Sequence, residues 1–353
     1  MSRPLVDRIV EAMLYEGYIL YPYRATTAKN RQRFTFGRVY PHAYHLDQKG
    51  AEPYVMQTQC LVKAASDAEV TINVRFLHPM ARQVGRLLEP ISTLPTDAEP
   101  AFEAVSSLRV GDTLHQTWQE AVEQTVAVEP LSLYTLTQEA VPHVFSFPAS
   151  RTIEAIEGEA GEIVGVLIRQ QAALEGVVEV HAEAVDAEVF KLTVRVLNNT
   201  PVLEDALTGQ DEVVMRTFAS THTILAVEEG TFFSMMDPPA NYAAIAAACE
   251  NTGTWPVLVG EDEAQDTLLS SPIILYDYPE LAPESPGDLH DGTEIDEILT
   301  LRIMTMTDAE KWEMRQVDDR ARQILQRTES MSQEDLLGLH GTIRDKHSHE
   351  EAP

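Results

Sequence analysis

Hydrophobic residues near the N-terminus of the chain recur at the spacing of an amphipathic helix. Leu5, Ile9 and Met13 lie four residues apart, and Ala12 lies beside them. This spacing places one apolar stripe along a helix over residues 4–16. Gly17 follows at the position of a C-terminal cap. We therefore expect a helix that packs against the rest of the protein by one face.

Farther along the chain, apolar residues alternate with polar ones, which is typical of half-buried strands. The alternation over 59–79 resembles that over 180–201, and each stretch has Asp-Ala-Glu between its two halves. Both stretches read as antiparallel hairpins, and their similarity predicts an internal repeat, although two unrelated hairpins would show the same pattern. Residues 122–136 and 141–147 predict further strands, and residues 223–234 predict a third hairpin around Gly230.

Helix signals are concentrated in the second half of the chain. A Ser/Thr residue followed three positions later by Glu forms a capping box, and a helix-capping Asp followed by proline marks a helix start. These signals predict helices that begin at Thr117, Asp237 and Thr307, and Asp211–Ala219 is also expected to be helical. The Asp237 helix is expected to run to about Cys249 and the Thr307 helix to about Thr328.

These patterns predict an α+β fold. It would consist of two related antiparallel β-units, arranged like a sandwich, with a helical and irregular C-terminal region. The predicted divisions are an N-terminal helix and first β-unit (1–88), a proline-rich linker (89–105), a second β-unit (106–236), a helical and irregular acidic region (237–342) and a disordered tail (343–353).

The stretch from Asn251 to Asp296 has no helix or strand period, and long irregular segments in compact domains are usually functional or disordered. From Glu261 to Leu299 it holds twelve Asp or Glu and no Lys or Arg. Its aromatic residues argue against disorder. We expect Trp255 and Tyr276 to be mostly buried and to anchor the segment to the body.

Charge is distributed unevenly. The formal net charge is −30, which disfavours nucleic acid and anionic membranes as partners. Yet no acidic residue occurs from Gly17 to Leu46, where Arg24, Lys29, Arg31, Arg33 and Arg38 form a basic island. This island could dock on the acidic segment of the same chain or recognise an acidic protein partner.

No apolar run is long enough to span a membrane, and the N-terminus has no signal core, so a cytoplasmic location is expected. Two cysteines, Cys60 and Cys249, cannot build a disulfide framework and are interpreted as structural.

No nucleotide-binding or hydrolase motif is present, and no cofactor is predicted. One group of carboxylates and an imidazole could hold a divalent metal, although turn chemistry explains the same residues: Asp288, His290, Asp291, Glu294 and Asp296.

Several longer motifs resemble an uncharacterised bacterial family that is associated with gene clusters of actinobacterial-type uptake nickel–iron hydrogenases. They are Tyr18–Arg24 with Asn30 and Phe34–Pro41, Asp237-Pro-Pro239, Asn251–Gly260, Leu269–Pro279, Ala282–Leu289 and Asp291–Ile303. The resemblance spans nearly the whole chain and implies an accessory role in making or supporting a hydrogenase. It implies no catalytic residue. Members of the family continue beyond the position of Pro353, and a missing C-terminal module would imply a reduced role.

Two functions follow from this reading. The first is a non-enzymatic accessory protein that binds another protein, such as a hydrogenase subunit or maturation factor. Its predicted partner-binding residues are Arg24, Lys29, Arg31, Arg33, Arg38, Tyr276, Tyr278, Glu284 and Asp288. The alternative is a metal-dependent enzyme or metal donor that uses the acidic 288–296 segment.

Overall fold

The computed structural model describes residues 3–14, 36–203, 210–261, 264–279, 303–315 and 319–330. The chain divides into two compact units. One comprises Met1–Tyr18 with Ala25–Pro279, and the other comprises Ile19–Arg24 with Glu280–Pro353. The first unit contains two antiparallel β-sheets that pack face to face, and the second contains two described helices.

The smaller of these two sheets has five strands in the order β13-β1-β11-β10-β7. Their bounds are Val55–Ala64 for β1, Val141–Phe147 for β7, Leu174–Ala184 for β10, Val189–Asn198 for β11 and Gly230–Phe232 for β13. Side chains alternate between the core and the outer face along β11, as expected for a sheet with one buried face.

The larger sheet has eight strands arranged around the long strand β2. Its path is β14-β15-β12-β2-β9-β8, and β3 and β6 also pair with β2. The bounds are Glu69–Ile91 for β2, Phe102–Val105 for β3, Trp118–Ser132 for β6, Ser150–Glu157 for β8, Ile163–Gln171 for β9, Ala219–Val227 for β12, Trp255–Leu258 for β14 and Thr267–Ser271 for β15. A separate two-stranded ribbon joins β4 (Ser107–Val110) to β5 (Thr113–Gln116).

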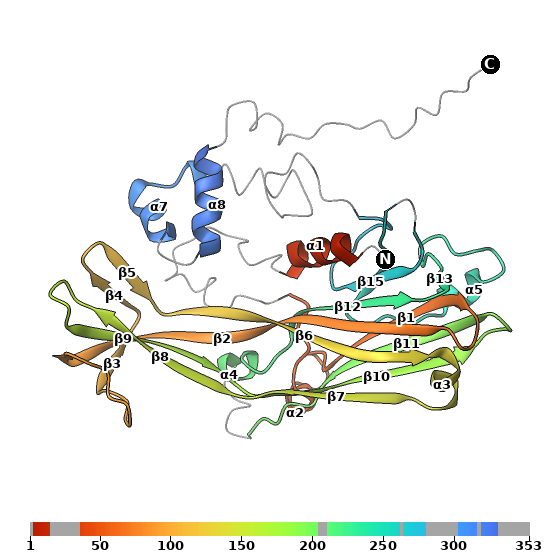
Figure 1. Ribbon diagram of the computed structural model, residues 1–353, viewed down its shortest axis with the longest axis horizontal. Helices are drawn as coiled ribbons and strands as arrows, with labels where there is room; N and C mark the ends of the chain where they lie inside the picture. Colours follow the sequence, from red (N-terminus) through yellow and green to blue (C-terminus); the bar gives the residue numbers. More distant parts are fainter. Residues whose placement is uncertain are drawn as a thin grey trace, which may run out of the picture. The chain divides into compact units, whose positions relative to one another are not determined.

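Strand β2 belongs to two parts of the structure at once. Its first part pairs with β6 and β12 and forms one layer of the sandwich. Its last part pairs with β3 and β9 and continues into an extension that also contains β8, to the left in Figure 1. The extension has small apolar clusters of its own, around Val166 and around Val84.

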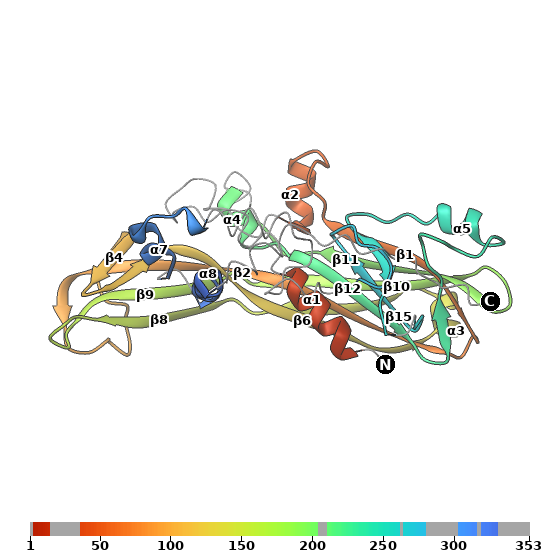
Figure 2. The ribbon, with the colours of Figure 1, turned by 90° about the horizontal axis from the view of Figure 1, so that it is seen from above.

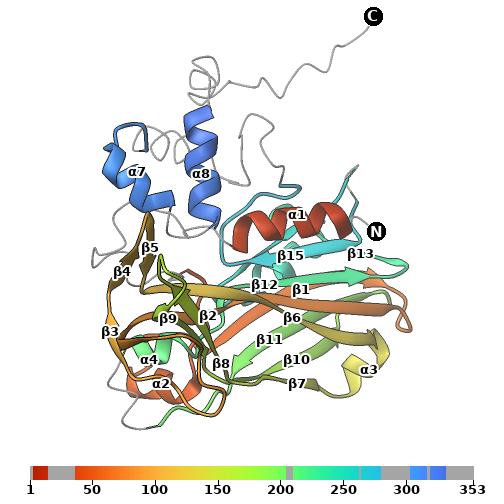
Figure 3. The same cartoon turned by 60° about the vertical axis from the view of Figure 1, so that its left-hand side comes forward.

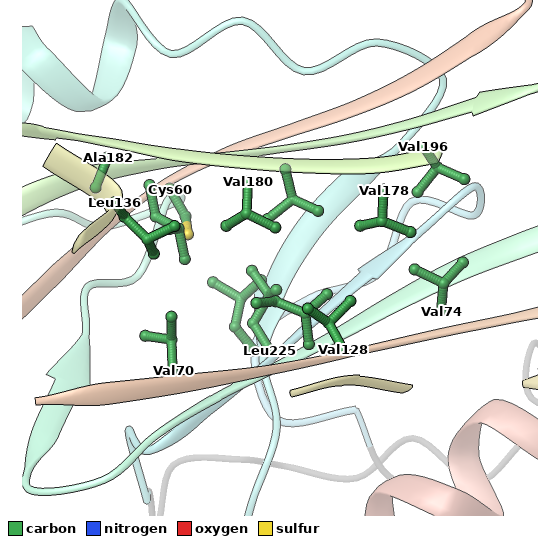
Figure 4. Close-up of a cluster of buried hydrophobic side chains, with 14 of the residues drawn as sticks. Cys60, Val70, Val74, Val128, Leu136, Val178, Val180, Ala182, Val196 and Leu225 are labelled. Atoms are coloured by element: carbon green, nitrogen blue, oxygen red, sulfur yellow. The ribbon is translucent and has the colours of Figure 1, made fainter. Parts of the chain in front are cut away.

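The main hydrophobic core lies between the two sheets. Figure 4 shows Val178, Val180 and Val196 of the five-stranded sheet pointing toward Val70 and Val74 of the other sheet. β-Branched residues dominate these positions, because their stiff side chains pack well on a pleated surface.

Helix α1 (Arg3–Leu14) covers part of the outer face of the eight-stranded sheet, as Figure 2 shows. Its buried residues Ile9, Val10 and Met13 pack against Leu77 of β2 and Leu269 of β15. This confirms the helix predicted from the apolar stripe. The remaining helices of the first unit are short: α2 (His42–Asp47), α3 (Leu133–Gln138), α4 (Gln210–Val214) and α5 (Ala243–Ala247).

The described part of the second unit contains α7 (Asp308–Arg315) and α8 (Asp319–Ser330). The capping box at the start of α7 is formed. The Glu310 carboxylate accepts from the Thr307 backbone N–H at 2.9 Å, and the Thr307 hydroxyl accepts from the Glu310 N–H at 3.3 Å. The predicted helix start at Thr307 is therefore confirmed.

The predicted α+β, sandwich-like fold of antiparallel sheets is confirmed. Only one of the two predicted repeat hairpins forms, however. β10 pairs with β11, whereas β1 pairs with β11 and β13, and β2 pairs with strands of the other sheet. Val62 and Val70 point into the same core from opposite layers, so the chain arches from one sheet to the other between them. The predicted hairpin around Gly230 does not form either, because β12 and β13 lie in different sheets.

Other local predictions are also corrected. Thr117–Glu120 does not open a helix, because Trp118 begins β6 and its ring is buried. The Asp237 helix is reduced to α5. Residues 89–105 do not separate two units, since β2, which extends to Ile91, pairs with β6 and β9 from beyond this stretch. The boundary between the compact units falls at Pro279 rather than at residue 236.

Gly176 supplies a first test of the core. It pairs with Phe145, and a Cβ atom at Gly176 would lie 2.3 Å from Cζ of that ring. Gly176→Ala is expected to lower the free energy of unfolding by about 1–3 kcal/mol, the usual cost of overpacking. Urea unfolding measures this loss. Combining the change with Phe145→Leu should cost less than the sum of the two single variants, because the smaller side chain relieves the overlap. Simple additivity would contradict the contact.

Candidate protein-binding surface

Three large apolar side chains are exposed at one edge of the eight-stranded sheet. Trp255 begins the edge strand β14 and is 44% exposed, whereas Ile274 and Tyr276 are 71% and 79% exposed. We call these three residues the Trp255 surface. Trp255 pairs with Ser271 of β15, and the chain then turns at Pro272 into the segment that carries the other two residues.

The segment after Pro272 is held against the outer edge of β14. The Tyr278 N–H donates to the Leu258 carbonyl at 2.8 Å, and the Leu258 N–H donates to Oδ1 of Asp277 at 2.8 Å. The other carboxylate oxygen of Asp277 accepts from the Ser234 hydroxyl at 2.5 Å. The segment therefore runs back along β14 from the Trp255 end to the Leu258 end.

Side chains alternate along this segment. Ile273 and Leu275 pack against the apolar cluster under α1, while Ile274 and Tyr276 face solvent. The inward residues and the Asp277 hydrogen bonds fix the backbone, so the outward residues are presented from a defined position. Little conformational entropy remains to be lost by this backbone when a partner binds.

Strand β15 is itself tied to the opposite sheet by buried hydroxyl groups. The Ser270 hydroxyl lies 2.7 Å from the hydroxyls of Thr58, on β1, and of Thr254. All three residues are buried. A satisfied polar contact between two layers specifies their register, because breaking it would leave buried groups unpaired. This contact supports the edge on which the Trp255 surface lies.

The structure corrects the predicted burial of Trp255 and Tyr276. Both rings are substantially exposed, and Ile273, Leu275 and Asp277 anchor the segment in their place. The stretch is also not irregular throughout, because β14 and β15 lie within it. A Trp255→Ala variant is thus not expected to show the large loss of stability that a core aromatic would.

Two further predicted partner-binding residues are described. Arg38 is 6% exposed and donates through Nη1 to the Tyr40 hydroxyl at 3.2 Å, so its buried position does not support the predicted role in partner binding. The neighbouring Val39 pairs with Phe218, which draws this stretch into the body. Tyr278 is partly buried against the main core and has a left-handed φ of 56°. Of the two tyrosines, Tyr276 is the one that solvent reaches freely.

The other predicted site residues lie outside the described residues. They are the partner-binding candidates Arg24, Lys29, Arg31, Arg33, Glu284 and Asp288, and the metal-ligand candidates Asp288, His290, Asp291, Glu294 and Asp296. The alternative function that depends on the 288–296 segment stays a prediction. Within the described ranges, no group of three or more His, Cys, Asp or Glu side chains is placed to hold a metal ion.

The two cysteines have the character of thiols rather than thiolates. Cys60 is fully buried, and burial raises the pKa of its thiol. Burial also raises the pKa of Cys249, which is partly exposed. Because the thiolate is the nucleophile, these shifts favour the structural interpretation of both residues.

Ile274 was not predicted as a binding residue, although the sequence contains a signal for it. In Ile273-Ile-Leu-Tyr276 every residue is large and apolar, so a period of two cannot be read from polarity. Pro272 and Pro279 delimit an extended stretch, and in an extended stretch at an edge alternate side chains must face opposite ways. That argument would have placed half of the run in solvent.

No helix within the described residues is long and apolar enough to cross a bilayer. In comparisons with known proteins, no family model, no curated protein and no solved structure matches this chain.

Proposed function

We propose that this protein is a non-enzymatic accessory protein that binds another protein through the Trp255 surface. The observation that supports the proposal is the exposure of three large apolar side chains on a backbone that hydrogen bonds and buried neighbours hold in place. Singly exposed apolar residues are normal on protein surfaces, whereas large exposed apolar patches mark interaction sites.

The residue types also fit a binding surface. Tryptophan and tyrosine are enriched among the residues that dominate binding energies, since each buries a large area with few rotatable bonds. The Tyr276 ring, with 79% exposure, has most of its area available for a partner. The partner would offer an apolar pocket to this ring.

The charge of the chain adds a constraint on the partner. With a net charge of −30, the protein attracts surfaces that carry Lys and Arg around their apolar centre. Association should therefore slow as salt is added, because exposed charges are screened beyond about 8 Å at physiological ionic strength. The same charge, with only two cysteines, supports a cytoplasmic protein whose partner is neither nucleic acid nor an anionic membrane.

The family resemblance supports the identity of the partner. We propose a subunit or a maturation factor of a nickel–iron hydrogenase, because the motifs over 251–260 and 269–279 that carry the resemblance also form the Trp255 surface. The exposure of Trp255, Ile274 and Tyr276 within these motifs supports this choice of partner.

Tyr276→Ala is expected to abolish capture of a hydrogenase subunit or maturation factor from the native host, measured by affinity capture and mass spectrometry. Losing one central aromatic typically weakens an interface by about 2 kcal/mol or more, roughly 30-fold. The thermal midpoint should barely change, since the ring is exposed. Trp255→Ala should act in the same direction.

Tyr134→Ala is the matched control. Tyr134 lies on α3 and is 61% exposed, so the same change removes another largely exposed ring from a different part of the protein. Capture that survives Tyr134→Ala and is lost with Tyr276→Ala supports the proposal. Equal capture by both variants would show that the Trp255 surface is not the contact. Capture of proteins unrelated to hydrogenases, lost in the same variant, would overturn the partner while keeping the surface.

A further inference from the structure

Strand β7 ends the five-stranded sheet. One of its edges pairs with β10 over its whole length, from Val141 opposite Val180 to Phe147 opposite Leu174. Its other edge has no strand beside it among the described residues, as Figures 1 and 3 show. Open edges present backbone donors and acceptors that can pair with another strand.

The hydrogen bonds of β10 reveal which groups of β7 face outward. The Glu175 N–H donates to the Thr200 hydroxyl at 3.0 Å, and the Glu175 carbonyl accepts from the Asn199 N–H at 3.0 Å, so the backbone of Glu175 points away from β7. Backbone groups alternate direction along a strand, so those of Gly176 point toward its partner Phe145. The backbone groups of Pro142, Val144 and Ser146 consequently face the open edge.

The outward direction of the backbone groups of residue 142 explains why a proline is tolerated at this position of β7. Pro142 has no N–H to donate, and proline within sheets is found where the missing N–H would face away from the ladder. The free edge thus offers the N–H groups of Val144 and Ser146 and the carbonyl groups of Pro142, Val144 and Ser146. All three residues are exposed, and Val144 is 75% exposed.

The side chains at this edge carry no charge. Pro142, Val144 and Ser146 share the outer face, and Val144 completes an apolar row that crosses the sheet through Val177 and Leu197 to Val55. Natural edge strands are usually protected by charged side chains or covered by other segments. The edge strand β8 follows that rule: it carries Glu154 and Glu157, and its Arg151 binds Glu99 at 2.7 Å.

We propose that β7 pairs with β7 of a second copy of this chain, antiparallel and about a two-fold axis at Val144. Val144 is the middle residue of the strand, so this register pairs both strands over their full length. The N–H of each Val144 donates to the carbonyl of the other, and each Ser146 N–H donates to the Pro142 carbonyl opposite. The two five-stranded sheets become one continuous sheet.

The pattern fits a second copy better than an unrelated peptide. A two-fold axis makes the same patch complementary to itself. It sets Val144 against Val144, so the apolar row of one copy continues into that of the other. It also sets Pro142, which cannot donate, opposite Ser146, whose N–H finds an acceptor. This interface does not include the Trp255 surface, so the β7 dimer and partner binding through the Trp255 surface can be tested independently.

Charge determines how the dimer responds to salt. Each copy has a net charge of −30, so repulsion opposes association. Because salt screens this repulsion, dimerisation should strengthen with ionic strength, the opposite of the salt effect expected for a basic partner. Sedimentation velocity over a concentration series, at low and high sodium chloride, should show a shift from 39.3 kDa toward twice that mass at high salt.

Val144→Lys should abolish this shift, because it sets two like charges directly opposite each other at the axis. Val122→Lys is the matched control, since Val122 lies on β6 and is 38% exposed. Loss of the dimer in the first variant alone supports the proposal. A wild-type protein that stays at 39.3 kDa under every condition, or a dimer that survives Val144→Lys, overturns it.

Cysteine cross-linking tests the register. In a Cys249→Ser background, Val144→Cys should form a covalent dimer under mild oxidation, because directly opposite Cα atoms in an antiparallel pair lie about 5.5 Å apart, within disulfide range. Ser146→Cys should not, because its symmetry mate is displaced by four residues, roughly 13 Å along the strand. Equal cross-linking of both variants would overturn the axis at Val144. Strong protection of β7 from hydrogen exchange only when another protein is added would show a different occupant and overturn the dimer.

Discussion

Phe76→Ala is expected to lower the free energy of unfolding by about 3–5 kcal/mol, the range for aromatic truncation in a packed core. Phe76 lies on β2 and has no exposed area. Its ring centroid is 4.7 Å from that of Phe218 and 5.8 Å from that of Phe147, so one truncation removes contacts to several strands at once. Urea unfolding followed by circular dichroism measures the loss.

Tyr276→Ala serves as the internal comparison for Phe76→Ala. Because that ring is exposed, its removal should change the free energy of unfolding by no more than about 0.5 kcal/mol. A loss below about 1 kcal/mol for Phe76→Ala would mean that the ring does not join the sheets as described. Phe76→Leu should fall between the two variants, since it keeps part of the apolar volume.

Acid is expected to destabilise the protein through two buried histidines. Burial lowers the pKa of His78 to about 4, and burial together with the nearby Arg75 guanidinium lowers that of His222 to about 4. In each ring one nitrogen lies near a backbone carbonyl: Nε2 of His78 is 3.0 Å from Ala172, and Nδ1 of His222 is 2.7 Å from Ser220. A carbonyl only accepts, so these nitrogens carry the proton.

The other nitrogen of each ring, Nδ1 of His78 and Nε2 of His222, is buried without a hydrogen-bond partner among the described residues. Protonation there would bury an unpaired charge, so the folded state resists it. The unfolded chain binds the proton from about pH 6.5 downward, whereas the folded protein binds it only near pH 4. Stability is therefore complete above pH 6.5 and falls between these values, by roughly 1 kcal/mol per histidine for each pH unit.

Urea unfolding at pH 7, 6 and 5.2 tests this dependence. Replacing both histidines, as His78→Gln with His222→Gln, should flatten the slope between pH 6.5 and 5.2, whatever it does to stability at pH 7. His42→Gln, at an exposed position on α2, should leave the slope unchanged. If the free energy of unfolding of the double variant falls with pH as steeply as that of the wild type, the acid sensitivity comes from carboxylates and not from these histidines.

The sequence predicted those elements whose signals are local. The stripe of Ile9 and Met13 requires only neighbours on one helix, and the Thr307–Glu310 capping box is completed within one turn. The β10–β11 hairpin was also predicted. Its turn is closed by Asp186, whose carboxylate accepts from the Glu188 and Val189 N–H groups at 2.9 Å.

Predictions failed where the choice of partner is made at long range. The alternation over 59–79 correctly marks two strands, but alternation does not encode which strand lies beside which. The capping-box pattern at Thr117 does not start a helix, because tertiary packing buries Trp118 in the sheet. The exposure of Trp255 and Tyr276 could not be predicted from their size, since aromatic rings dominate cores and interfaces alike.

The separation between β1 and its partners has a consequence for biosynthesis. β1 ends at Ala64, but its partner β11 is complete only at Asn198, 134 residues later (198 − 64), and β13 comes after that. At about 5–20 residues per second, a ribosome needs roughly 7–27 s to supply β11. During this interval the apolar run Cys60–Val62 has no sheet to join. The nascent chain that carries β1 thus depends on a chaperone to remain soluble until β11 emerges.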